Sequence, residues 1–181
     1  MYKNITRWDP AVDENPPDKD VVIIGDDIFL DVNWQNQYID YVFNKIATAS
    51  NTRFLLPTED VERVDQWFVW AWESSDIGED PWPSSNLTLL SPPSDLELLL
   101  KLPTVGYGVW VREDADWFDI YTVTQMKAKT LSTVLFDGEV WYQCIGMDCD
   151  CRFGIRCSGR TKVFYSLVES AKKAGMGVFC G

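Results

Sequence analysis

Histidine is absent from the 181 residues, and this absence removes several kinds of chemistry at once. Without it the chain cannot form Ser-His or Cys-His catalytic dyads, and it offers no imidazole as a metal ligand. Three signature motifs are also missing, namely the G-x-G-x-x-G dinucleotide fingerprint, the P-loop and the G-x-S-x-G nucleophile turn. These absences favour a non-catalytic protein over an enzyme.

Long apolar runs are lacking as well. No stretch of the sequence is long and apolar enough to suggest a membrane span, and no signal peptide is recognisable. We therefore expect a cytoplasmic protein, with reduced thiols and without a membrane partner.

Basic residues are scarce, with 16 Lys and Arg against 28 Asp and Glu, which gives a net charge of −12. The imbalance lies in residues 1–100, where six basic and 19 acidic residues give −13; residues 101–181 carry +1. Direct nucleic-acid binding is not expected, because it normally depends on cationic contacts to phosphate. The charge fits an ordinary cytosolic protein, a binder of basic surfaces, or a mimic of nucleic acid.

Apolar runs alternate with helical patterns along the chain. The β-branched run Val21–Ile24 predicts a strand that is buried on both faces. Further strands are predicted at 52–56, 86–90, 104–111, 139–145 and 177–180, and helices at 33–49, 59–73, 95–102 and 162–174. The stretch 113–138 is harder to assign, with one helical candidate at 124–135.

This alternation implies an α/β fold with right-handed crossovers and a mostly parallel sheet. About six strands are too few for a closed eight-stranded barrel, so we predict a partial or degenerate TIM-like barrel. An open doubly wound sheet is the alternative. Residues 1–20, with three prolines, predict an extended arm anchored by Trp8, and 21–181 form a single α/β domain.

Acidic residues follow several predicted strands, at the end of a parallel sheet where ligands usually bind. If the strand ends converge, one rim collects many carboxylates. Three interpretations stay open: acids in first turns of helices, a docking face for a basic partner, or a divalent-metal site. The candidate partner-binding acids are Asp26, Asp27, Glu59, Asp60, Asp95, Glu113, Asp114, Asp116 and Asp119.

Four of the five cysteines form a C-x4-C-x-C-x5-C array. Four thiolates could hold zinc or an iron–sulfur cluster, although the spacing matches neither zinc ribbons nor radical enzymes. Reduced loop cysteines without a cofactor are the alternative. The candidate metal ligands are Cys144, Cys149, Cys151 and Cys157.

Tryptophan is abundant, with nine residues, and three of them fall within Trp67–Trp72. Helical spacing places Trp67 on the apolar stripe of the predicted helix 59–73, and thus in the core. Trp70 and Trp72 lie partly off that stripe, which makes them candidate anchors of a protein–protein interface.

Several segments, in order, resemble a phage-associated three-cysteine-motif family of unknown function. They are Trp8-Asp9-Pro10, Val21–Phe29, Ile39–Phe43, Thr52–Leu56, Trp82–Leu87 and Ser166–Phe179. The resemblance covers most of the chain from Trp8 onward, and it implies a radical-enzyme-like barrel with an N-terminal cysteine cluster suited to an iron–sulfur centre.

The chain departs from that family at the strand ends. Its first cysteine is Cys144, so the N-terminal cluster is missing, and Pro57-Thr58-Glu59-Asp60 replaces a basic turn. Cys144–Cys149 replaces a Gly-Gly-Glu type of turn. No catalytic residue of the family can therefore be assigned here, which suggests a scaffold reused for binding.

Together these observations predict a phage-encoded, non-catalytic acidic protein. Its expected partner is a host protein or nucleoprotein complex with a basic surface. Inhibition of host nucleic-acid machinery or of antiviral defence, as by an anti-CRISPR-like nucleic-acid mimic, is the expected role. The alternative is a zinc or iron–sulfur enzyme, or an accessory subunit, derived from a radical-enzyme barrel.

Overall fold

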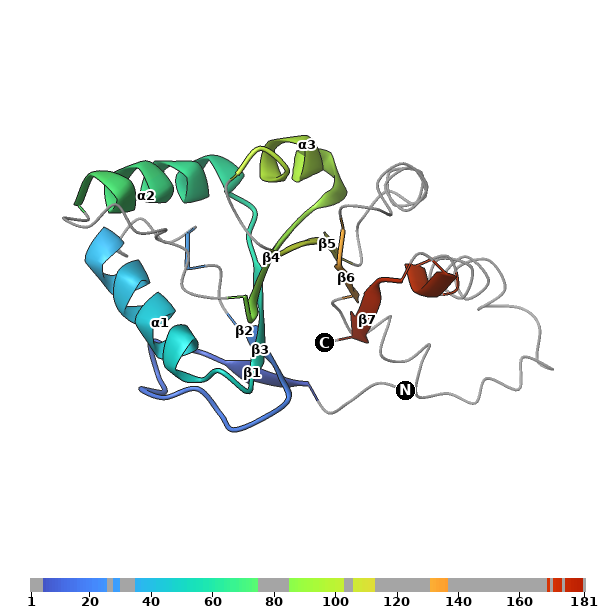
Figure 1. The fold of residues 1–181 in the computed structure, drawn as a ribbon, viewed down its shortest axis with the longest axis horizontal. Coiled ribbons are helices and arrows are strands. Elements are labelled where there is room, and N and C mark those ends of the chain that lie inside the picture. Colours follow the sequence, from blue (N-terminus) through green and yellow to red (C-terminus); the bar gives the residue numbers. More distant parts are fainter. Residues whose placement is uncertain are drawn as a thin grey trace.

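The computed structural model describes residues 5–25, 28–29, 35–74, 85–102, 106–112, 131–136, 169, 171–173 and 175–180. Within these residues the chain forms a curled sheet of seven parallel strands, with helices after β2, β3 and β4 and helical residues before β7 (Figure 1). The strands are β1 (Thr6–Trp8), β2 (Val21–Ile24), β3 (Arg53–Pro57), β4 (Leu87–Ser91), β5 (Tyr107–Val111), β6 (Thr133–Phe136) and β7 (Gly177–Cys180).

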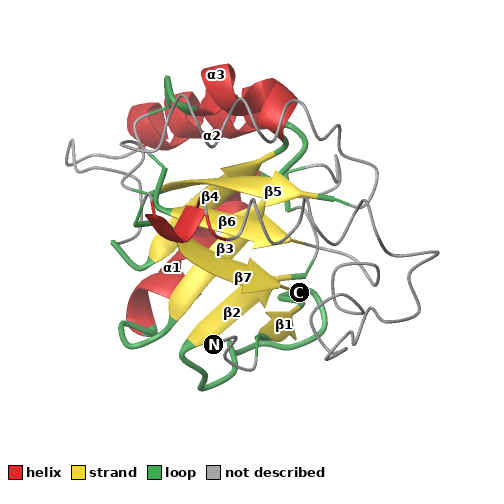
Figure 2. Cartoon of the chain, turned by 90° about the vertical axis from the view of Figure 1, so that its right-hand side faces the viewer, coloured by secondary structure: helices red, strands yellow, loops and turns green. Residues whose placement is uncertain are grey.

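The spatial order of the strands is the same as their order in the sequence, β1 to β7, and each neighbouring pair is parallel. Such a sheet has no switch point at which the winding reverses, so the doubly wound alternative does not apply. The curled sheet is a half-barrel, which confirms the predicted partial TIM-like barrel (Figure 2).

In the described part of the chain the sheet has seven strands, where about six were expected. Two of the seven, β1 and β6, were not among the predicted strands. Strand β1 comes from the segment predicted to be an extended arm and pairs with β2 in parallel. Trp8 anchors this segment as expected: its side chain is 1% exposed, and its Nε1 donates to Asp13 O at 2.8 Å. A second tie comes from the Tyr38 hydroxyl, which donates to Pro10 O at 2.7 Å.

Side chains alternate between the two faces of each strand, as the pleat requires. In β2, Val22 and Ile24 belong to the large core cluster shared with the helices, whereas Val21 and Ile23 belong to a smaller cluster on the other face. The smaller cluster also contains Leu55, Leu90 and Leu135 and fills the inner face of the half-barrel. The strands are therefore buried on both sides, as the continuous apolar runs predict.

The main helices bury the stripes that their sequences predict. Helix α1 (Asn36–Thr48) buries Ile39, Val42, Phe43 and Ile46, and helix α2 (Val61–Ser74) buries Val61, Val64, Trp67, Phe68 and Ala71. Between β4 and β5 the chain forms a short 3-10 turn, η1 (Pro93–Asp95), followed by the single-turn helix α3 (Leu96–Leu99). The helix predicted at 95–102 is therefore shorter than expected.

The largest error of the sequence-based prediction lies at β6. Residues 133–135 were assigned to a helical candidate, but Thr133–Phe136 form a strand between β5 and β7. The predicted strand at 139–145 lies outside the described residues. Near the end of the chain, Glu169 and Ala171–Lys173 are helical, as predicted, and Gly175, with φ +80°, follows them in the C-cap position before β7.

Candidate functional site

Three acids of the predicted rim lie within the described residues, and two of them have structural roles. Glu59 and Asp60 follow β3, and Asp95 ends the 3-10 turn after β4. Asp60 precedes α2 and caps it, since its Oδ1 accepts from the backbone N of Arg63 at 2.8 Å. Its own backbone N donates to Thr58 Oγ1 at 3.1 Å. This is the ordinary use of an acid at a helix start.

Glu59 is paired with a cation. Its carboxylate forms an ion pair with Arg112, which follows β5, so the pair spans the end of β4. The Arg112 guanidinium also lies over the Trp110 ring, 5.4 Å from its centroid. At this point the rim is charge-compensated, which weakens the case for a continuous acidic edge. The pairing was missed from the sequence because 53 residues separate Glu59 from Arg112.

The other members of the rim, Asp26, Asp27, Glu113, Asp114, Asp116 and Asp119, lie outside the described residues. So do the four candidate metal ligands, Cys144, Cys149, Cys151 and Cys157. Among the residues that are described, no group of three or more Cys, Asp or Glu is arranged to hold a metal ion.

A different surface combines exposed acids with exposed apolar side chains. On the outer side of α2, Val69 is 53% and Trp72 is 60% exposed, and on α3 Leu98 is 41% exposed. Acids lie beside them on the same two helices. We call this surface the α2–α3 face: Glu62, Asp65, Gln66, Val69, Trp72 and Glu73 from α2, and Glu97, Leu98 and Lys101 from α3 and the residues after it.

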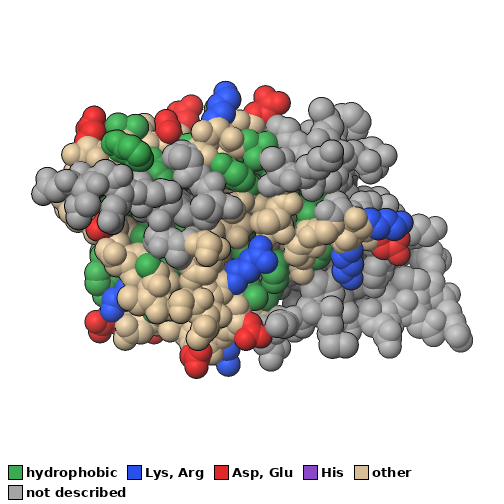
Figure 3. Space-filling view, viewed as in Figure 1, with side chains coloured by type: hydrophobic (Ala, Val, Ile, Leu, Met, Phe, Trp, Pro, Cys, Tyr) green, Lys and Arg blue, Asp and Glu red, His purple; other side chains and the backbone are tan. Residues whose placement is uncertain are grey.

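The spacing along α2 explains why these side chains share one face. Glu62, Asp65, Val69 and Glu73 follow one another at three- and four-residue steps, opposite the buried stripe, and Gln66 lies four residues after Glu62 on the same side. Figure 3 shows acidic side chains, with hydrophobic ones between them, along the edge formed by α2 and α3. The face carries four acids against one cation, Lys101.

A shallow groove of about 410 Å³ lies between the two helices. It is lined by Val61, Glu62, Asp65, Gln66, Leu98, Lys101 and Leu102. Apolar walls with carboxylates at the edge suit a partner that presents an apolar side chain flanked by Lys or Arg.

The two tryptophans that the sequence nominated as anchors differ in burial. Trp70 is half-buried and packs against the main core, so its role is largely structural. Trp72 remains a candidate anchor, since more than half of its surface is exposed. Leu98 and the groove were missed, because their exposure depends on the packing of α3 against α2.

Among the helices in the described part of the chain, none is long and apolar enough to cross a bilayer. We compared the chain with protein-family models, with curated proteins and with solved structures, and no family, relative or structural neighbour was found.

Proposed function

We propose that the protein is a non-catalytic binding protein that docks on a basic surface of a partner protein through its α2–α3 face. The observation that carries the proposal is the combination of exposed Trp72, Val69 and Leu98 with four acids on two adjacent helices. Exposed aromatic and apolar side chains supply binding energy, and the surrounding charges select the partner and speed its association.

The charge of the whole chain supports the same proposal. A net charge of −12, with −13 in residues 1–100, attracts cationic surfaces over a distance of about 10 Å at moderate salt. The proteins with the most basic surfaces include those that bind nucleic acid. We therefore propose host nucleic-acid machinery, or an antiviral nucleoprotein complex, as the target, with the acids occupying phosphate positions.

Affinity capture from a bacterial lysate tests the docking face. We expect the immobilised protein to retain a partner at 50 mM NaCl and to release it at 500 mM NaCl. The E62K/D65K variant should retain at least tenfold less of it, and W72A should also weaken retention.

The matched control is D13K/D18K, which makes the same change in charge. Asp13 and Asp18 are exposed and lie in the loop between β1 and β2, at the opposite end of the molecule from α2 and α3 (Figure 1). Retention should survive in this control. Equal losses in the two charge variants, or capture that is indifferent to salt, would refute a specific α2–α3 docking face.

Competition tests the nature of the target. If the acids replace phosphates, short double-stranded DNA or RNA should elute the captured partner, and the protein should displace nucleic acid from it. If the partner binds the protein and nucleic acid at the same time, the docking proposal stands, but the proposal that the acids replace phosphates is wrong.

A further inference from the structure

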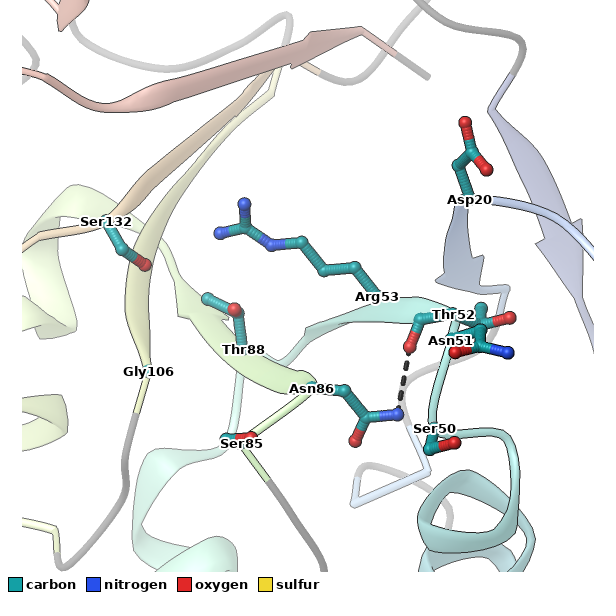
Figure 4. A pocket seen from close by; sticks show the side chains of 10 residues that line it. All are labelled: Asp20, Ser50, Asn51, Thr52, Arg53, Ser85, Asn86, Thr88, Gly106 and Ser132. Carbon is teal, nitrogen blue, oxygen red and sulfur yellow. Dashed lines mark hydrogen bonds between the residues drawn. The ribbon is translucent and has the colours of Figure 1, made fainter.

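A polar pocket lies at the opposite end of the strands from the rim, where β3 to β6 begin. Its volume is about 420 Å³. Figure 4 shows its lining: Asp20, Ser50, Asn51, Thr52, Arg53, Ser85, Asn86, Thr88, Gly106 and Ser132. Most of these side chains are neutral hydroxyls and amides, and Arg53 is the one cation among them.

Arg53 is the first residue of β3, and its side chain is half-buried on the inner face of the half-barrel. One nitrogen of its guanidinium donates to Thr133 Oγ1 on β6, and the group lies over the Phe179 ring, 5.3 Å from the centroid. Burial lowers the pKa of Arg53, but a guanidinium stays charged at any physiological pH. The charge is therefore held partly out of water.

No carboxylate among the described residues pairs with Arg53. Asp20 lines the same pocket, but in Figure 4 the Arg53 side chain extends away from it, toward Thr88 and Ser132. A partly buried charge without a counter-charge is costly, and a hydroxyl and a ring face compensate it only in part. An anion from outside the chain would complete the compensation.

One glycine lies close to the guanidinium and a second lies close to the Thr88 hydroxyl. A Cβ on Gly177 would lie 3.4 Å from Arg53 Nη1, and one on Gly106 would lie 3.1 Å from Thr88 Oγ1. Asn86, in contrast, is occupied: its Nδ2 donates to Ile46 O, Ala49 O and Thr52 O at 3.3, 3.1 and 2.9 Å. Ser132 is occupied as a donor too, because its Oγ donates to Tyr107 O at 3.0 Å. The side chains that can still donate to a ligand are thus Arg53 and the hydroxyl of Thr88.

We propose that this pocket binds the phosphate group of a small phosphorylated metabolite, with Arg53 as its main ligand. The planar guanidinium can donate two parallel hydrogen bonds to phosphate oxygens, and the neighbouring Thr88 hydroxyl can donate to a third. The pocket falls in the range of about 300–1,000 Å³ that is typical of small-molecule sites, so it holds more than the phosphate group. The site is independent of the α2–α3 face.

Calorimetric titration of the full chain at constant ionic strength in chloride tests the proposal. The ligands are inorganic phosphate, ribose 5-phosphate and ribose. We expect ribose 5-phosphate to bind, inorganic phosphate to bind more weakly and ribose not to bind. Equal affinities for inorganic phosphate and ribose 5-phosphate would identify free phosphate as the ligand, bound by Arg53 in the same way.

Variants locate the site. R53M should lower the affinity for ribose 5-phosphate at least tenfold, and the control K101M, which removes a cation on the α2–α3 face, should leave it unchanged. If R53M does not fold, the R53K variant provides the test. Lysine keeps the positive charge but lacks the planar guanidinium with its paired donors, so R53K should bind ribose 5-phosphate several-fold more weakly than the wild type. The proposal would be overturned if neither phosphate ligand gave a heat of binding with the wild-type protein above that of a chloride titration. Equal affinities of R53K and K101M for ribose 5-phosphate would overturn it as well.

Discussion

At the scale of single residues, Asn86 connects two elements that are 40 positions apart. Its side chain lies just before β4 and donates to three backbone carbonyls around the end of α1. Ile46 O and Ala49 O also accept from the backbone N of Ala49 and of Thr52, at 3.1 and 3.0 Å. The amide thus adds a side-chain donor from a distance to the carbonyls at the end of the helix. Its own Oδ1 is buried, and no described residue donates to it.

Asn86→Ala should therefore lower the free energy of unfolding by about 1–3 kcal/mol, because the hydrogen bonds from Nδ2 to the three carbonyl oxygens are lost. Urea denaturation followed by circular dichroism measures the change. The control is Asn44→Ala, which removes the exposed 3.3 Å hydrogen bond from Asn44 Nδ2 to Asp40 Oδ2. It should change stability by less than about 0.5 kcal/mol. Equal effects in the two variants would contradict the capping role.

Two buried tryptophans offer a second comparison. Trp67 is fully buried against Phe43 and Phe68, with ring centroids 4.6 and 5.2 Å away, but its Nε1 has no hydrogen-bond partner among the described residues. Trp8 is equally buried, and its Nε1 donates to Asp13 O. The rings thus differ in whether the indole N–H is satisfied.

We expect Trp8→Phe to destabilise the protein by about 1 kcal/mol more than Trp67→Phe does. Both changes remove similar apolar area, but only the first breaks a hydrogen bond, and the second removes an unsatisfied donor. Equilibrium unfolding of both variants gives the difference. A larger loss in Trp67→Phe would show that packing of the indole outweighs its hydrogen bonding.

At the scale of elements, the start of α2 shows how an acid can serve structure instead of binding. Asp60 caps the helix, whereas Asp65, one turn further along, is exposed and belongs to the α2–α3 face. The sequence placed Asp60 among the candidate binding acids because a cap and a binding acid look alike without coordinates. The two roles predict opposite effects of substitution.

Asp60→Ala should cost about 0.5–2 kcal/mol in stability, because the backbone N of Arg63 loses its acceptor. Asp65→Ala should leave stability nearly unchanged and weaken partner retention. Thermal denaturation of both variants, combined with the capture assay, separates the roles. If Asp60→Ala is as stable as the wild type, the cap contributes nothing.

Elements with strong local patterns were predictable, and elements defined by their neighbours were not. The buried stripes of α1 and α2 follow from helical spacing, and the β-branched run of β2 follows from its composition. Thr133–Phe136, by contrast, is a four-residue segment whose strand conformation depends on pairing with β5 and β7. Its local sequence does not exclude a helix, so propensity was overridden by tertiary contacts.

The candidate sites were predictable only in part, for the same reason. The excess of acidic residues follows from the composition, and the exposure of Trp72 follows from its spacing on the helix. Together they indicate an acidic surface suited to binding a protein. The Glu59–Arg112 pair and the pocket around Arg53 join residues from separate strands, which only the register of the sheet brings together. A sequence without aligned relatives carries no signal for such contacts.

At the scale of the whole molecule, the acidic excess opposes folding, because like charges are brought closer together in the compact state. In the described residues of 5–112, 13 acids face seven cations. Glu59 and Glu14 form ion pairs with Arg112 and Lys45, but the acids of this group still outnumber its cations by six. Many carboxylates therefore repel one another across the surface.

Raising NaCl from 10 to 150 mM should accordingly stabilise the protein, since the screening length shortens from about 30 to 8 Å. We expect a higher urea midpoint with an unchanged denaturant slope. The E62K/D65K variant, which is less acidic by four charges, should respond less. A wild-type midpoint that falls with salt would show that attractive pairs dominate the surface instead.

The sequential order of the strands has a consequence for synthesis. Each strand from β2 to β6 is hydrogen-bonded to the strand before it and the strand after it in the chain. A growing polypeptide can therefore add one strand and its helix at a time onto structure already made, without waiting for a distant segment. Folding of this kind, from the N-terminus onward, suits translation at about 5–20 residues per second. During such folding, the strand added last has an unpaired edge, which can aggregate with other chains until the next strand emerges.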